Sequence, residues 1–135
     1  MHSRELAELF LRKARQDEFA LDKLIADPAS PDEVIGFHAQ QAVEKTLKAV
    51  LALHAIRFGK IHEIGQLLAL LRKNSIACPS EFDALDRLSP FAADFRYEDL
   101  PSGPERLFDR TWAADNVRRV KAWAESVVRA KPEII

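Results

Sequence analysis

The chain is poor in glycine, proline and cysteine, and these shortages limit the kinds of fold and binding site it can have. Its four glycines and seven prolines are few, and most of them fall between segments with helical periodicity. Cys78 is the single cysteine among 135 residues, which excludes an intramolecular disulfide and any zinc site built on two or more thiolates. A lone thiol fits a reducing compartment, so the cytoplasm is the predicted location.

Long hydrophobic runs and a surplus of one charge are absent as well. The longest weakly polar stretch, 49–56, is broken by His54 and is far shorter than the roughly 20 residues of a membrane-spanning helix. Charges occur throughout 1–15, so we expect no export signal and no membrane partner. Lys and Arg number 20 against 21 Asp and Glu. Charge alone therefore selects no partner, although a local basic face is compatible with this balance.

What the chain does have is apolar periodicity. Hydrophobic residues make up 47% of it, enough for one folded domain spanning 1–135. Apolar side chains recur at three- and four-residue spacing in five segments, and no segment alternates like a strand. Those segments are 3–24, 33–56, 62–74, 81–93 and 105–130. The pattern predicts an all-α, up-and-down bundle of four or five helices, and the short break between the second and third predicts an antiparallel pair.

A polar stripe runs beside the apolar arc of the second predicted helix. Its members lie three, four and three residues apart and are His38, Gln41, Lys45 and Lys48. Two ammonium groups, a carboxamide and an imidazole suit phosphate oxygens and a base or sugar edge. The alternative, which periodicity alone favours, is a solvated face where Glu44 and Lys48 form an i, i+4 pair worth about 0.3 kcal/mol.

Asp17 is unusual because it falls on the core-facing stripe of the first predicted helix. A buried aspartate costs free energy unless a cation or hydrogen-bond donors meet it. The candidate partners are Lys45 and Arg96, so we predict a structural ion pair at Asp17. Arg96 and Tyr97 suit recognition of a phosphate or carboxylate. They are equally compatible with a structural role, in which Arg96 anchors their loop to Asp17 or to helix carbonyls.

The sequence offers little for metal or cofactor chemistry. The four histidines show no paired ligand spacing, and there is no Cys-x-x-Cys, P-loop, Gly-x-Gly-x-x-Gly or Gly-x-Ser-x-Gly motif. We therefore predict neither a metal site nor a cofactor. His62, at the start of the third predicted helix, is interpreted as a neutral imidazole that caps this helix.

Three runs of sequence resemble the HEPN family of prokaryotic helical domains: FHAQQAVEKTLKAVLALH at 37–54, KIHEIGQLL at 60–68 and FRYEDLP at 95–101. The family pattern also has an aspartate in the middle of its first helix, as at Asp17. This resemblance covers nearly the whole chain. It implies a small α-helical bundle that usually dimerises, often beside a minimal nucleotidyltransferase with which it forms a toxin and antitoxin. Some members cut RNA, whereas others bind nucleotides or are non-catalytic.

The chain departs from the ribonuclease members of the family in one respect. The resemblance implies for those members an Arg, four to six residues and a His near the start of the last long helix, with two copies facing each other across a dimer. Here no histidine follows His62. Arg57 and His62 have Arg-x4-His spacing, but they span the loop before the third predicted helix, and chance matches to so loose a pattern are common.

The resemblance and the residues together predict a homodimeric HEPN domain that is non-catalytic or binds a nucleotide or RNA phosphate, with a nucleotidyltransferase chain as its partner. The predicted binding residues are His38, Gln41, Lys45, Lys48, Arg96 and Tyr97. One alternative is a metal-independent ribonuclease toxin that uses Arg57 and His62. Another is a scaffold whose polar stripe serves only the dimer.

Overall fold

The computed structural model describes residues 2–92 and 108–131. The elements in chain order are α1 (Ser3–Ile25), α2 (Asp32–Leu53), α3 (Ile64–Lys73), the 3-10 helix η1 (Ser80–Phe91) and α4 (Arg110–Ala130). These residues include no strand, so the predicted all-α bundle is confirmed. No helix within them is long and apolar enough to cross a membrane. Arg96 and Tyr97 lie outside the described residues.

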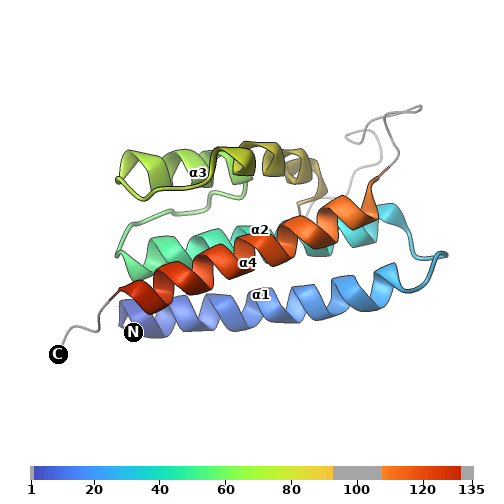
Figure 1. Ribbon diagram of the computed structural model, residues 1–135, viewed down its shortest axis with the longest axis horizontal. Coiled ribbons are helices and arrows are strands. Elements are labelled where there is room, and N and C mark those ends of the chain that lie inside the picture. Colours follow the sequence, from blue (N-terminus) through green and yellow to red (C-terminus); the bar gives the residue numbers. More distant parts are fainter. Residues whose placement is uncertain (1, 93–107, 132–135) are drawn as a thin grey trace.

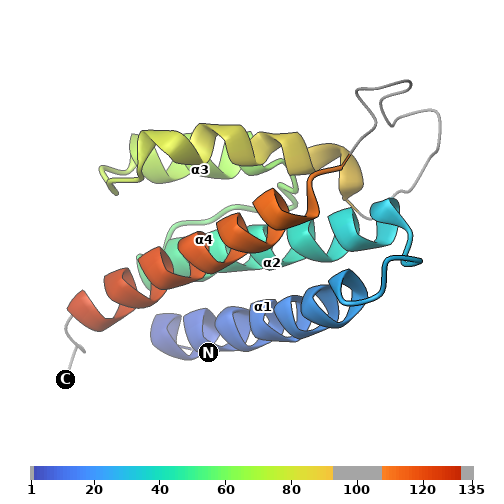
Figure 2. The same cartoon turned by 45° about the vertical axis from the view of Figure 1, so that its right-hand side comes forward.

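The central helix of the bundle is α2. All the other helical elements contact it. Figures 1 and 2 show α1 on one side of α2 and the pair of α3 and η1 on the other, with α4 crossing the face between them. Every residue from Thr46 to Leu53 is buried. A helix that packs against neighbours on most sides is apolar on most faces, which explains why the apolar arc of α2 is so broad in the sequence.

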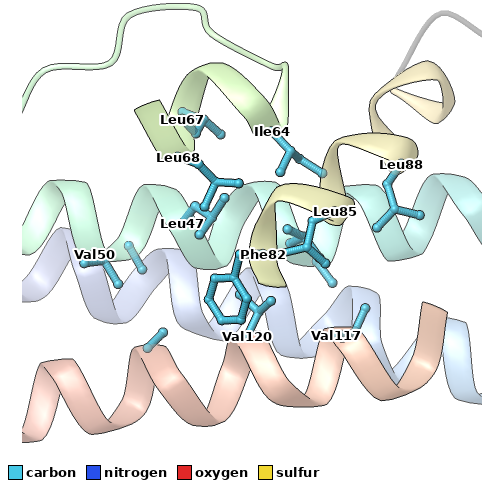
Figure 3. Close-up of a cluster of buried hydrophobic side chains, with 14 of the residues drawn as sticks. Leu47, Val50, Ile64, Leu67, Leu68, Phe82, Leu85, Leu88, Val117 and Val120 are labelled. Atoms are coloured by element: carbon cyan, nitrogen blue, oxygen red, sulfur yellow. The ribbon is translucent and has the colours of Figure 1, made fainter. Parts of the chain in front are cut away.

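The α-helix expected at 81–93 is instead the 3-10 helix η1. Its apolar residues recur strictly at every third position and are Phe82, Leu85, Leu88 and Phe91. A 3-10 helix has three residues per turn, so this spacing aligns all four side chains on one face. The first three are buried, and Figure 3 shows them in one cluster with side chains of α2, α3 and α4. The element thus takes the helical period that its apolar pattern matches.

The connection from α2 to α3 makes these helices parallel, so the predicted antiparallel pair is wrong. It spans 54–63 and is longer than the break expected at 57–61. His62, near its end, reaches Glu44 in the middle of α2, so the connection runs back along that helix (Figure 1). Extended chain covers about 3.3 Å per residue and helix about 1.5 Å, so this length is enough for the return. Among the helices of the described residues, the up-and-down order is broken only here.

The start of α4 is set by a capping aspartate and by an ion pair to α2. Asp109 Oδ1 accepts a hydrogen bond from the Trp112 backbone N–H at 2.9 Å, so α4 begins at Arg110 and not at the expected 105. The Arg110 guanidinium lies 3.0 Å from Asp32 in the first turn of α2. These two helices therefore start together, and Figure 1 shows them running in the same direction.

Candidate functional site

Two buried carboxylates organise the polar side of α2. Asp17 comes from α1 and Glu44 from α2 itself. Each carboxylate holds one lysine ammonium and the Nδ1 atom of one histidine. We call the first group the Asp17 cluster, which consists of Asp17, His38 and Lys45. The second is the Glu44 cluster, which consists of Gln40, Glu44, Lys48 and His62.

The Asp17 cluster joins α1 to α2. Lys45 Nζ lies 2.6 Å from one carboxylate oxygen of Asp17, and His38 Nδ1 lies 3.0 Å from the other. The Asp17 side chain is 11% exposed and that of Lys45 27%. The expected contact between Asp17 and Lys45 is therefore present, and His38 adds a partner that the sequence did not indicate. The other expected partner, Arg96, falls outside the described residues.

The Glu44 cluster joins α2 to the connection at 54–63. One Glu44 oxygen accepts a hydrogen bond from Lys48 Nζ at 2.9 Å and lies 3.1 Å from His62 Nδ1. The other oxygen accepts from the Gln40 amide at 2.8 Å, and the same amide nitrogen donates to the His62 carbonyl at 3.1 Å. The Phe58 ring centroid lies 5.3 Å from Lys48 Nζ, close enough for a cation–π contact. The connection thus covers this cluster.

Lys48 is the residue of the polar stripe that fits a solvent-exposed helix face least. Its pair with Glu44 has the expected i, i+4 spacing, but the two side chains are only 8% and 6% exposed. The ammonium is consequently enclosed and not presented to solvent. Gln41 lies at the edge of the Glu44 cluster and donates to the Gln40 side-chain oxygen at 2.7 Å. The stripe residues that remain partly exposed are His38, Gln41 and Lys45.

Gln40 and Glu44 were not among the predicted site residues. Gln40 is fully buried, yet it links the Glu44 carboxylate to the backbone of the connection. A polar side chain between Ala39 and Ala42, both buried, is the signal that could have marked it. The same reasoning that identified Asp17, the cost of burying a polar group without partners, applies to this glutamine.

Comparison with known proteins agrees with this architecture. The model of the HEPN domain family matches residues 7–134. The chain belongs to the HEPN domain family. It is also similar to a Methanocaldococcus jannaschii protein named "Putative toxin MJ1304", with 28% identity over 106 residues that cover 78% of this chain and 68% of the relative. No solved structure shows a significant match to the chain.

Arg57 and His62 of this HEPN domain both lie on the connection at 54–63. His62 precedes Glu63, the N-cap of α3. The first two backbone N–H groups of that helix donate instead to Ser89 Oγ at 3.0 Å and to Asp86 Oδ1 at 2.8 Å, so the predicted capping by His62 is wrong. The His62 side chain is 62% exposed. Arg57 is exposed as well and has no ion pair within the described part of the chain. The last helix, α4, carries no histidine.

The two histidines held by carboxylates are the chemically versatile groups of the HEPN domain. When the Nδ1–H of His38 donates to Asp17, or that of His62 to Glu44, the other ring nitrogen, Nε2, is left as an acceptor. In the doubly protonated ring, Nε2 carries a proton as well and is a donor. Each ring is therefore fixed in orientation and able to exchange a proton or bind an anionic oxygen.

The described residues offer no comparable site for a metal ion or a reactive thiol. Across residues 2–92 and 108–131, no three His, Cys, Asp or Glu side chains converge to hold a metal ion. Cys78 is half-buried, and burial raises the pKa of its thiol, an effect that the nearby Arg72 guanidinium opposes. A thiol with a raised pKa stays protonated near neutral pH and is a poor nucleophile. The polar side of α2 is thus the best candidate site in the described structure.

Proposed function

We propose that this HEPN domain is a homodimeric, non-catalytic module of a toxin-antitoxin system, which binds nucleotide or RNA phosphates on the polar side of α2 and works beside a nucleotidyltransferase chain. Membership of the family and the likeness to a protein named a toxin support the first part of the proposal. The binding function is carried by one observation, the row of partly exposed donors on α2 formed by His38, Gln41 and Lys45.

Lys45 and His38 retain hydrogen-bonding capacity beyond their contact with Asp17. An ammonium has three N–H groups, and the contact with Asp17 uses one of those of Lys45. His38 uses Nδ1 for the same carboxylate, and Nε2 of the doubly protonated ring can donate to a phosphate oxygen. We assign the phosphate to these two side chains and a base or sugar edge to Gln41. Lys48 supports the site through Glu44, because its ammonium is enclosed. Arg96 and Tyr97 stay predicted members of the site.

We expect the protein to bind 5′-AMP and a 12-nucleotide single-stranded RNA. Titration calorimetry should give an affinity that falls as salt rises, because attraction between these donors and phosphate is largely ionic. His38→Ala should weaken binding about tenfold, the usual effect of losing one hydrogen bond to a charged group. His2→Ala, at an exposed histidine outside the site, is the matched control. Absence of heat with both probes would favour the scaffold alternative.

We also expect the same RNA to remain intact during incubation with the protein in the presence of a chelator. Cleavage by general acid–base catalysis needs a titratable group beside a cation that holds the phosphate. The ribonuclease members of the family are expected to have such a histidine in the last helix, where this chain has none. Denaturing gel electrophoresis of the RNA checks the prediction.

One observation favours the metal-independent ribonuclease as a second candidate. His62 is exposed and its Nδ1 is held by the buried Glu44, which is an arrangement suited to proton transfer. Arg57, exposed on the same connection, is the cation of this alternative. Discrete RNA products that disappear in both His62→Ala and Arg57→Ala would establish it and overturn the non-catalytic proposal.

We expect the protein to be a homodimer in solution. On α4, Trp112, Trp123 and Val127 pack against the core but keep partly exposed edges. Trp112 and Trp123 are eleven residues apart and Trp123 and Val127 four, so all three lie on one face of the helix. This face, or the polar stripe on α2, is the proposed interface. Sedimentation equilibrium at micromolar concentration should report twice the chain mass. A species of 15.3 kDa alone would contradict the dimer.

A further inference from the structure

The outward face of α1 carries a basic and aromatic surface that lies apart from the polar side of α2. Figures 1 and 2 both show α1 at the edge of the bundle, with the other described helices on its inner side. An open hollow of about 410 Å³ lies on this face and is lined by Arg12, Arg15, Gln16 and Phe19. We call these four residues the α1 face.

The α1 face is positively charged, and the nearest preceding carboxylate on the helix is that of the exposed Glu8, one turn before Arg12. The segment 9–16 contains three cationic residues, Arg12, Lys13 and Arg15, and no carboxylate. None of the three forms an ion pair within the described structure. The acidic residues that follow on α1 are engaged elsewhere, because Glu18 pairs with Lys121 at 2.8 Å and Asp22 contacts Arg118 at 3.4 Å. In a chain of net charge −1, this concentration of free guanidinium groups favours an anionic ligand.

Phe19 gives the α1 face an aromatic platform. Its side chain is 66% exposed, and it is the one exposed large hydrophobic residue in the described part of the chain. Lys23 Nζ lies 5.4 Å from the ring centroid, so a further cation accompanies the aromatic ring. An exposed aromatic ring among unpaired arginines is the combination with which proteins bind unpaired bases and the phosphates between them.

We propose that the α1 face binds a segment of single-stranded RNA. One base stacks on Phe19, Arg12 and Arg15 contact adjacent phosphates, and the Gln16 amide reaches a base edge. Arg12 and Phe19 are seven residues apart, which is about 10 Å along a helix, so the face can follow more than one nucleotide. The inference rests on the proposed RNA binding of this domain but assigns it a second, separate surface. Duplex RNA does not fit, because its bases are not free to stack on a side chain.

The test uses the full chain, fluorescence anisotropy and a labelled 12-nucleotide oligouridylate. Phe19→Leu keeps an apolar side chain but removes the ring and should weaken binding about tenfold, the scale of one lost stacking contact. Phe19→Tyr keeps the ring and should bind like the parent chain. The double variant Arg12→Ala, Arg15→Ala should reduce the slope of log affinity against log salt by about 1.4, since each phosphate contact to a single strand contributes about 0.7.

Controls separate this inference from the proposed function and from a protein interface. Arg129→Ala, at an exposed arginine near the end of α4, should leave both affinity and salt slope unchanged. If Phe19→Leu binds RNA normally while His38→Ala does not, the α1 face is overturned and the site on α2 stands. If the oligouridylate does not bind at all, the α1 face is overturned, and titration with 5′-AMP decides whether the site on α2 stands. If Phe19→Leu instead dissociates a dimer in sedimentation and leaves RNA affinity unchanged, the α1 face is an interface between copies of the chain and the inference is wrong.

Discussion

Replacement of Glu44 by alanine is expected to destabilise the protein by about 3–5 kcal/mol, the usual cost of breaking a buried ion pair from one side. The substitution leaves the Lys48 ammonium enclosed against Phe58 with no carboxylate. It also removes the acceptor of the Gln40 amide. A urea denaturation curve followed by circular dichroism measures the change in the free energy of unfolding.

The double variant Glu44→Leu, Lys48→Met tests whether the unpaired charge causes this loss. Apolar residues of similar volume often replace a buried ion pair at little or no cost, so the double variant should be markedly more stable than Glu44→Ala. Glu81→Ala is the matched control, because Glu81 forms an exposed pair with Arg119 at 3.7 Å, and such surface pairs contribute at most about 1 kcal/mol. An unchanged denaturation midpoint in Glu44→Ala would refute the structural role of the cluster.

The buried state of the Glu44 cluster could not be predicted from α2 alone. An i, i+4 pair of Glu44 and Lys48 looks like an ordinary surface pair in the sequence. Its burial comes from Phe58 and His62, which belong to a connection whose path the periodicity of the helices does not specify. The same path makes α3 parallel to α2. Both errors thus have one physical cause, the return of a ten-residue connection along the central helix.

The fold and the Asp17 contact were more predictable because they depend on helix periodicity. Apolar spacing identifies which face of each helix is buried, and a charged residue on that face needs a partner wherever it packs. Antiparallel packing then brings the middle of α1 to the middle of α2, where Lys45 is available. The participation of His38 was not predicted, because it depends on side-chain orientation within a turn of α2 and not on spacing alone.

Asp17→Ala is expected to lower the free energy of unfolding by about 3 kcal/mol, the low end of the range for a buried pair, because Lys45 is partly exposed and can recover some hydration. His38 loses its carboxylate at the same time. Since the Asp17 cluster is the main polar link between α1 and α2, the loss should appear as a lower urea midpoint with an unchanged slope.

A matched substitution on the same helix isolates the effect of burial. Asp22 also lies on α1 and contacts a cation, Arg118, at 3.4 Å, but both side chains are exposed. Asp22→Ala should therefore cost less than about 1 kcal/mol. A double-mutant cycle between Asp17→Ala and Lys45→Ala should give a coupling energy of about 1–3 kcal/mol, since the two groups are in direct contact. Additive effects in that cycle, or equal losses in the two aspartate variants, would show that Asp17 does not stabilise the domain through this ion pair.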